Sequence, residues 1–196
     1  MLLDNLFKNF IYDPVSALGL LAFYFLLINL PISLVAVFKK QSSLTVKILT
    51  ILVNLLISFQ LLSRWSISGH FPISNLYESL YFLAWGITMG QLLIEREYQS
   101  PIIPSIAITI ELLTVAFACF VLPEDLKLSS NLVPALRSSW LVMHVSVVML
   151  SYAALIIGSL LSVSVLFINK KMPLQIRSSS TAVSYTHLRA HETKSY

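Results

Sequence analysis

The sequence has little charge and a single cysteine. Of its 196 residues, 11% are charged and 57% are hydrophobic, whereas a soluble domain averages about 25% charged and about 45–50% apolar residues. So few charges cannot cover a soluble surface, which excludes a cytosolic globular enzyme, a disordered chain and a small secreted protein. The lone Cys119 excludes an internal disulfide framework, a Cys-x-x-Cys redox pair and a cysteine-based zinc site. A polytopic membrane protein remains.

The sequence contains several long runs of apolar residues. A helix that crosses a bilayer needs about 20 mostly apolar residues. The sequence therefore predicts an all-α fold, a transmembrane helical bundle of about five spanning helices, with the lipid bilayer as its surroundings. The predicted spans are Val15–Phe38, Leu44–Leu62, Leu76–Ile94, Ile102–Leu122 and Trp140–Ile168.

Basic residues set the predicted orientation, because they favour cytoplasmic loops. The formal net charge is +4, but no basic patch with interleaved aromatic residues exists, so no nucleic-acid partner is expected. With the N-terminus outside, the inner basic residues are Lys39, Lys40, Arg96, Lys170, Lys171 and Arg177, and the outer ones are Lys8, Arg64, Lys127 and Arg137. This asymmetry predicts that the loops Ser63–Asn75 and Pro123–Ser139 are external.

The last residues differ from the rest of the chain. From about Ser178 the sequence is polar, and Val183–Tyr196 has neither helix caps nor an apolar face. The stretch SYTHLRAHET resembles a translated sequencing-adapter tail. His187 and His191 have a spacing that can bind a metal, but no third ligand accompanies them. We therefore predict a transmembrane portion over residues 1–177 and a non-native or disordered tail over residues 178–196.

The loop between the second and third spans is dense in aromatic and cationic side chains. Trp65 and Arg64 are candidate ligand contacts, although both residue types also anchor helices at a membrane interface. His70 lies between Gly69 and Pro72, where it is either a ligand-binding or a turn residue.

The start of the third span has two interpretations. Asn75 as N-cap places Glu78 three residues into the helix, which is a capping box that glutamine would also fill. Alternatively, Glu78 contacts an arginine such as Arg64 or a proton path. Tyr77, Tyr81 and Trp85 fall near one helix face, either as an aromatic wall for a flat ligand or as ordinary interfacial packing. The residues alone leave these alternatives open.

Two ionisable residues stand out in the later spans. Glu111 is near the middle of its span, where an ionised side chain costs roughly 2.5–3.5 kcal/mol, so we expect it to face a partner or a cavity. His144 is near the outer end of the last run, one helical turn from Trp140 on the same face. An imidazole in that position is either structural or an axial ligand of a haem iron.

Two blocks of sequence carry a family resemblance. They are RWSISGHFPISNLYESLYFLAW (64–85) and LVPALRSSWLVMHVSVVMLSYAALIIGSLLSV (132–163). They resemble the cytochrome c assembly family of membrane proteins, in its CcsA (ResC) branch, over about residues 12–177. The matching positions are a Gly-His-x-Pro turn leading into Tyr-Glu-Ser (Gly69, His70, Pro72, Tyr77, Glu78 and Ser79) and a Trp-x-x-x-His (Trp140 and His144).

The resemblance implies haem handling on the outer face of an energy-transducing membrane. It implies haem b as substrate and ligand, a CcsB (ResB)-like membrane partner, and transfer to an apocytochrome c carrying Cys-x-x-Cys-His. The membrane is then a thylakoid or bacterial inner membrane, with the haem site facing the lumen or periplasm. The expected metal ligand is His144, no catalytic residue is assigned, and the expected haem-binding residues are His144, Trp140, His70, Arg64, Trp65, Tyr77 and Glu78.

The sequence departs from the family pattern in its second half. The family's tryptophan-rich external segment (WGxxWxWD) is absent, as is a second external histidine ligand beyond it. We therefore expect an N-terminal portion of such a protein, inactive by itself in a haem-attachment complex of haem lyase type. Two alternatives are a transporter or channel fragment built around Glu111 and a membrane scaffold without a ligand.

Overall fold

The computed structural model describes residues 14–39, 43–97, 100–127 and 139–171. Its elements are α2 (Pro14–Phe38), α3 (Leu44–Ser68), α4 (Leu76–Glu97), α5 (Ile102–Ala116), the π-helix η1 (Phe117–Val121), α6 (Glu124–Lys127) and α7 (Ser139–Lys171). Every element in these ranges is helical, which confirms the all-α prediction. The predicted tail, with His187 and His191, lies outside the described residues, as do Lys8, Lys40, Arg137, Arg177 and most of the loop Pro123–Ser139.

Within the described residues, four helices are long and apolar enough to cross a membrane: Val15–Phe38, Leu44–Ser68, Ile102–Val121 and Trp140–Val163. The remaining long helix, α4, has 22 residues and spans about 33 Å at 1.5 Å per residue. Its sequence is more polar, but Glu78, Thr88 and Gln91 are buried against its neighbours. The chain is an integral membrane protein in which the most polar long helix turns its polar residues toward neighbouring helices and exposes Leu76, Met89 and Leu93.

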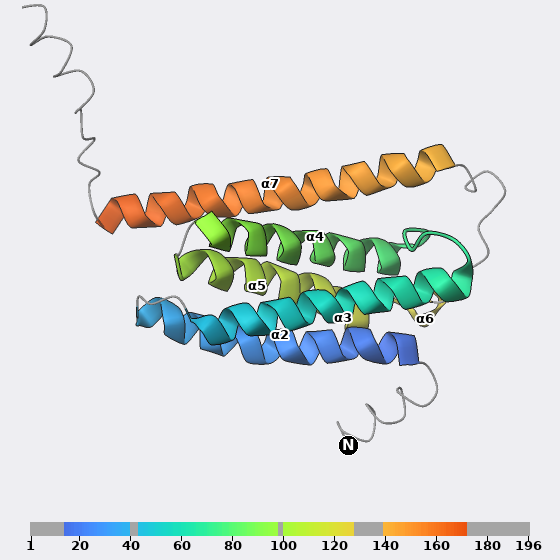
Figure 1. Ribbon diagram of the computed structural model, residues 1–196, viewed down its shortest axis with the longest axis horizontal. Helices are drawn as coiled ribbons and strands as arrows, with labels where there is room; N and C mark the ends of the chain where they lie inside the picture. The colour runs from blue at the N-terminus through green and yellow to red at the C-terminus, as the bar shows by residue number, and fades with distance from the viewer. Residues whose placement is uncertain (1–13, 40–42, 98–99, 128–138, 172–196) are drawn as a thin grey trace, which may run out of the picture. The chain divides into compact units, whose positions relative to one another are not determined.

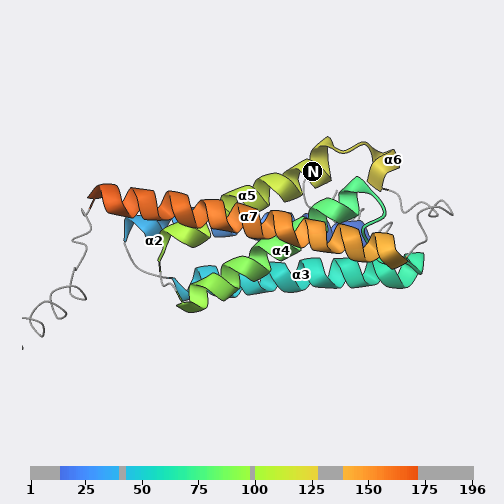
Figure 2. The same cartoon turned by 90° about the horizontal axis from the view of Figure 1, so that it is seen from above.

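Helices α2 to α5 form a closed four-helix ring (Figures 1 and 2). Helix α2 packs against α3 and α5, and α4 packs against the same two helices on the other side. Fully buried apolar side chains from all four helices meet inside the ring, including Leu26, Ile57, Ala84 and Ile108. The ring therefore has an interior of its own, into which polar residues also project.

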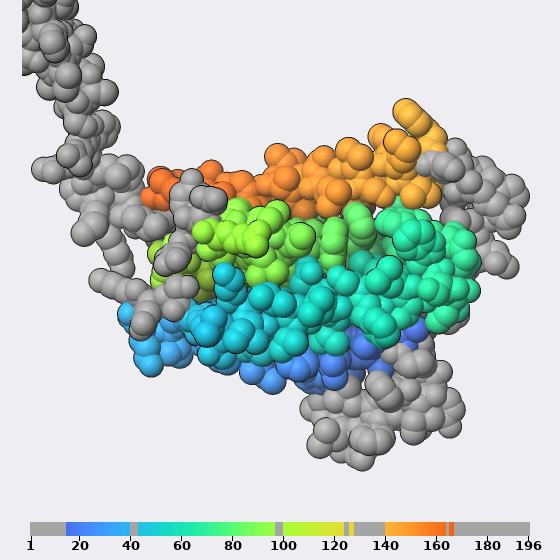
Figure 3. Space-filling model, in the orientation of Figure 1, coloured from blue at the N-terminus to red at the C-terminus, as the bar shows by residue number. Residues whose placement is uncertain are grey.

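Helix α7 lies alongside α4 (Figure 3). A Cβ added to Gly86 would lie 3.0 Å from the Cβ of Ala153, and one added to Gly90 would meet Ile157. Residue numbers rise together in these two contacts, so α7 and α4 run parallel. Extending this register by nine residues puts His144 level with Tyr77.

Several helix ends differ from the sequence-based expectation. Helix α4 ends at Glu97 rather than Ile94, and α7 ends at Lys171 rather than Ile168. The second span does not end at Leu62 but continues to Ser68, because Gly69 adopts φ +70° and its N–H bonds to the carbonyl of Trp65. Glycine takes this left-handed conformation without steric cost and commonly ends a helix there. Arg64 and Trp65 are therefore helical rather than loop residues. The fourth span is α-helical only to Ala116 and ends in the π-helical turn η1.

Candidate functional site

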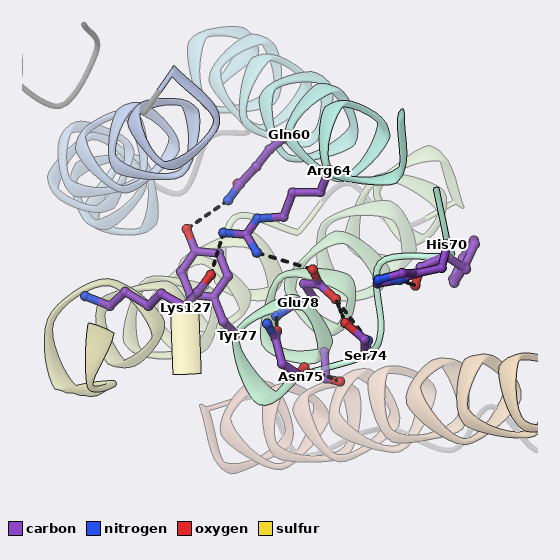
Figure 4. A network of polar contacts seen from close by, with 10 residues as sticks. Gln60, Arg64, His70, Ser74, Asn75, Tyr77, Glu78 and Lys127 are labelled. Carbon is purple, nitrogen blue, oxygen red and sulfur yellow. Dashed lines mark hydrogen bonds and ion pairs between the residues drawn. The ribbon is translucent and has the colours of Figure 1, made fainter. Parts of the chain in front are cut away.

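A buried ion pair joins the end of α3 to the start of α4. Arg64 Nη1 lies 3.2 Å from Glu78 Oε1, and the two side chains are 8% and 0% exposed. Arg64 Nη2 also donates to the carbonyl of Lys127 at 2.9 Å. Its guanidinium lies 4.5 Å from the centroid of the Tyr77 ring. Figure 4 shows Arg64 between Tyr77 and Glu78. Arg64 thus ties α3 to both α4 and α6.

The other carboxylate oxygen of Glu78 fixes the turn that precedes α4. Glu78 Oε2 accepts hydrogen bonds from Ser74 N at 2.9 Å and from Ser74 Oγ at 2.7 Å. Asn75 Oδ1 accepts from Glu78 N at 2.8 Å, which confirms the predicted N-cap. The reach of Glu78 goes one residue further back than in the usual capping box. One carboxylate oxygen of Glu78 thus accepts from the turn before α4 and the other contacts Arg64, so a capping role and an arginine contact occur together.

A chain of side chains runs inward from the ion pair. Gln60 Nε2 donates to Tyr77 Oη at 3.0 Å, the Tyr77 and Tyr81 rings lie 4.8 Å apart, and Tyr81 Oη lies 3.0 Å from Cys119 Sγ. Tyr77 and Tyr81 are buried in the ring interior. The predicted aromatic wall is therefore not one surface, because Tyr77 and Tyr81 face the ring interior and Trp85 faces a separate space.

That space is a pocket of about 260 Å³ between α3, α4 and the turn that joins them. Trp85 stacks on Phe82 with ring centroids 5.7 Å apart, and its Nε1 donates to Ser58 Oγ at 2.9 Å. Trp65 meets Phe71 edge to face at 5.2 Å, and Phe71 in turn meets Phe82 edge to face at 5.8 Å. The lining residues are Ser58, Leu61, Leu62, Trp65, Phe71, Pro72, Phe82 and Trp85. Sequence reasoning missed this pocket, although Phe82 and Trp85, one helical turn apart, were a signal for it.

His70 lies in the turn beside this pocket. Its ring is half-buried, and Nδ1 is 3.3 Å from the carbonyl of Phe71. The left-handed Gly69 before it and the buried Pro72 after it fix the path of the turn. Among the described residues, no cluster of three His, Cys, Asp or Glu side chains forms a metal site.

The two α7 residues are exposed. Trp140 is 75% exposed and His144 is also exposed. None of the interactions described links either residue to the Arg64–Glu78 pair. The predicted site residues thus fall into a buried group (Arg64, Tyr77 and Glu78) and an accessible group (His70, Trp65, Trp140 and His144). The α4–α7 register nevertheless puts both groups at the same end of the bundle.

Comparison with known proteins decides the family. The sequence profile described as "Cytochrome C assembly protein" matches residues 73–196. The chain belongs to the cytochrome c assembly family. The match begins in the turn before α4, so it takes in the Glu78 cap and all of α7.

Individual relatives are similar in amino-acid sequence to most of this chain. The "Cytochrome c biogenesis protein CcsA" of Prochlorococcus marinus strain AS9601 is 86% identical over 183 residues, which is 93% of this chain and 59% of that protein. The protein of that name in strain MIT 9312 is 85% identical over equal shares. In strain NATL1A the identity is 55% over 91% of this chain and 57% of the relative. The chain thus spans less than two thirds of the length of these relatives.

Proposed function

We propose that this chain is the part of a cytochrome c biogenesis membrane protein that offers one axial ligand to haem at the outer face of the membrane. Membership of the cytochrome c assembly family carries the proposal. The membrane would be an energy-transducing one, with the haem site facing the periplasm or the lumen. The substrate would be haem b, delivered together with a CcsB (ResB)-like partner to an apocytochrome c that carries Cys-x-x-Cys-His.

His144 is the proposed haem ligand. Its imidazole is exposed near the start of α7, and a neutral imidazole nitrogen is a common axial ligand of haem iron. Trp140, one turn away on the same helix face, supplies an exposed aromatic surface against which a porphyrin can pack. The two residues offer one side of a haem, so a ligand on the opposite side has to come from another segment.

Arg64, Tyr77 and Glu78 would act as positioning residues. Two of the guanidinium nitrogens of Arg64 are already bonded to Glu78 and to the Lys127 carbonyl. A buried, paired guanidinium is poorly placed to bind a propionate, because the bond to Glu78 would have to break first. The ion pair instead holds the turn that bears His70 and one wall of the aromatic pocket. His70 and Trp65 remain candidates for direct haem contact.

The test requires a complete protein, made by joining residues 1–177 to the C-terminal part of the 86% identical relative. We expect His144→Ala to lower the haem absorbance of the purified protein and to abolish covalent haem attachment to a co-expressed apocytochrome c. Added imidazole should restore the absorbance spectrum, since it can fill the vacated iron coordination site.

Ser146→Ala is the matched control. Ser146 lies on the same helix near His144, and its hydroxyl bonds only to the backbone of its own helix, at Val142. This variant should keep normal haem content and normal cytochrome c yield. Normal values in His144→Ala as well would refute the ligand assignment.

A further inference from the structure

A layer of polar side chains lies inside the four-helix ring, away from the Arg64–Glu78 pair. Each helix contributes one fully buried residue: Asn29 from α2, Thr50 from α3, Gln91 from α4 and Glu111 from α5. Asn29 Nδ2 donates to Thr50 Oγ1 at 3.1 Å, and Gln91 Nε2 lies 3.5 Å from the same oxygen. These two contacts place Asn29, Thr50 and Gln91 at one level of the ring.

The helix register places Glu111 less than one turn from this level. Helices α4 and α5 are antiparallel, and the contact between Tyr81 and Cys119 sets their register. Met89 then lies level with Glu111, and Gln91 is two residues further along, about 3 Å at 1.5 Å per residue. Helix α5 packs against both α2 and α4, so Asn29 and Gln91 lie on the helices nearest to Glu111.

The amide and carboxyl oxygens of this layer, unlike Thr50 Oγ1, have no hydrogen-bond donor among the residues that the structure describes. Asn29 Oδ1, Gln91 Oε1 and both carboxyl oxygens of Glu111 are buried and accept no hydrogen bond from any residue that the structure describes. Nor does Glu111 form an ion pair with a described cationic side chain. Buried polar atoms are almost always satisfied by protein or by ordered water. A group of acceptors therefore requires either internal water or a proton on the carboxyl group.

An ionised Glu111 would be an isolated charge inside the ring. Such groups are normally held neutral by proton uptake, and a protonated carboxyl also supplies one of the missing donors. The ionisable groups on the packed elements are Tyr24 on α2, Tyr77, Glu78, Tyr81, Glu95, Arg96 and Glu97 on α4, and Cys119 on η1. In addition, Lys47 of α3 interacts electrostatically with Glu95. In the register described, Tyr81 and Glu95 each lie about two turns from Glu111, on opposite sides.

The two sides of Glu111 differ in polarity. Toward Tyr81 and Cys119 the ring is closed by buried Val115, Ala84 and Ala118. Toward the other end, Gln91 Nε2 donates to Glu95 Oε1 at 2.9 Å, and Glu95 is only half-buried. Among these ionisable and polar groups, only Gln91 and Glu95 form a hydrogen-bonded route from the polar layer to the surface.

We propose that Glu111, with the amide oxygens of Asn29 and Gln91, forms an internal site that binds one proton together with water. The proton leaves the Glu111 carboxyl as that group becomes carboxylate, passes along water held beside the Gln91 amide, and is taken up by the Glu95 carboxylate, which becomes a carboxylic acid; it returns by the same route. The site opens only toward the Glu95 end of the ring, which is the end opposite the Arg64–Glu78 pair. It is independent of the proposed haem ligand.

Infrared spectroscopy of the purified chain tests the site. We expect an absorption band of a protonated carboxylic acid at pH 7 that shifts in D2O, that is lost in Glu111→Gln and that persists in Glu95→Gln. Gln91→Leu should slow the D2O shift several-fold. Gln60→Leu is the matched control, because it removes a buried glutamine at the far end of the ring, and it should leave the rate unchanged.

A second measurement needs no variant. A hydrophobic carbodiimide reacts with protonated carboxyl groups in apolar surroundings, and mass spectrometry should find the adduct on Glu111. The proposal is wrong if Glu111 stays unlabelled while the band survives Glu111→Gln. It is also wrong if sodium or calcium ions raise the melting temperature of the native chain but not of Glu111→Gln, since the layer would then be a metal-cation site. An unchanged exchange rate in Gln91→Leu would overturn the route.

Discussion

The charge of Arg64 is tolerated inside the protein because Glu78 lies beside it. The arginine belongs to the last turns of α3 and the glutamate to the first turn of α4, so the pair depends on the turn between them. A buried pair contributes little net stability when intact, but removing one partner leaves the other charge without compensation. The same carboxylate also holds Ser74, so one side chain controls both the ion pair and the turn.

Replacing Glu78 by glutamine should therefore destabilise the protein. We expect the free energy of unfolding to fall by about 2 kcal/mol, because Arg64 loses its counter-charge while the cap survives. In an Arg64→Met background the same change should cost much less. Denaturant unfolding of the four proteins in detergent measures this coupling, and equal costs in both backgrounds would contradict a role for the ion pair.

For single residues, local contacts could be predicted from the sequence and contacts between distant residues could not. Asn75 and Glu78 were predictable as a cap because a cap is a local pattern with a fixed spacing. The contact of Glu78 with Arg64 joins residues 14 positions apart, and it depends on how far α3 extends. The sequence allowed this contact only as an alternative.

At the scale of elements, helix existence was predictable and helix ends were less so. Apolar runs of about 20 residues located all the long helices. The end of α3 was misplaced by six residues, from Leu62 to Ser68, because polarity was read as the end of the helix. Gly69, a residue that commonly ends helices, was the better signal. The aromatic pocket was not predicted for the same reason. Trp65 lines the pocket as a residue of the last turns of α3, whereas the sequence pattern predicts a loop there.

The contact between α4 and α7 depends on small residues, as is common between membrane helices. We expect Gly86→Ala to weaken it, because the added methyl would lie 3.0 Å from Ala153 Cβ and neither helix backbone yields easily. Overpacking of this kind costs about 1–3 kcal/mol, which outweighs the helix-propensity gain of up to about 1 kcal/mol.

Gly158→Ala is the control for this prediction. A Cβ at Gly158 meets nothing within 4 Å, so the propensity gain should remain and the protein should become slightly more stable. Thermal unfolding in detergent measures both variants. Equal shifts would mean that α7 does not rely on close approach at Gly86.

At the scale of the whole molecule, the basic residues at the two ends of the bundle differ in their contacts and exposure. Arg64 is buried in its ion pair, and Lys127 Nζ donates to the carbonyl of Cys119 at 2.8 Å. Both were counted as outer basic residues, yet both are engaged by the fold. Lys39 and Arg96, at the other end, are exposed. An external His70 turn therefore remains a prediction from the distribution of basic residues.

Cysteine labelling tests this orientation. In a Cys119→Ser background, a cysteine at Ser68 should react with a membrane-impermeant reagent in intact cells, because Ser68 ends α3 on the predicted outer side. A cysteine at Ser42, which follows α2, should react only after the cells are broken. The reverse pattern would mean that the protein has the opposite topology.

The closed ring of α2 to α5 also bears on how the chain is made. The four helices are consecutive, so the ring can close before the residues of α7 leave the ribosome. Helix α4, the most polar of the long helices, gains its partner α3 as soon as it is synthesised, and Asn29 and Glu111 leave the lipid once α5 arrives. Helix α7 then adds to a finished surface through Gly86 and Gly90. Biosynthesis in chain order would thus keep the costly polar side chains exposed to lipid for the shortest time.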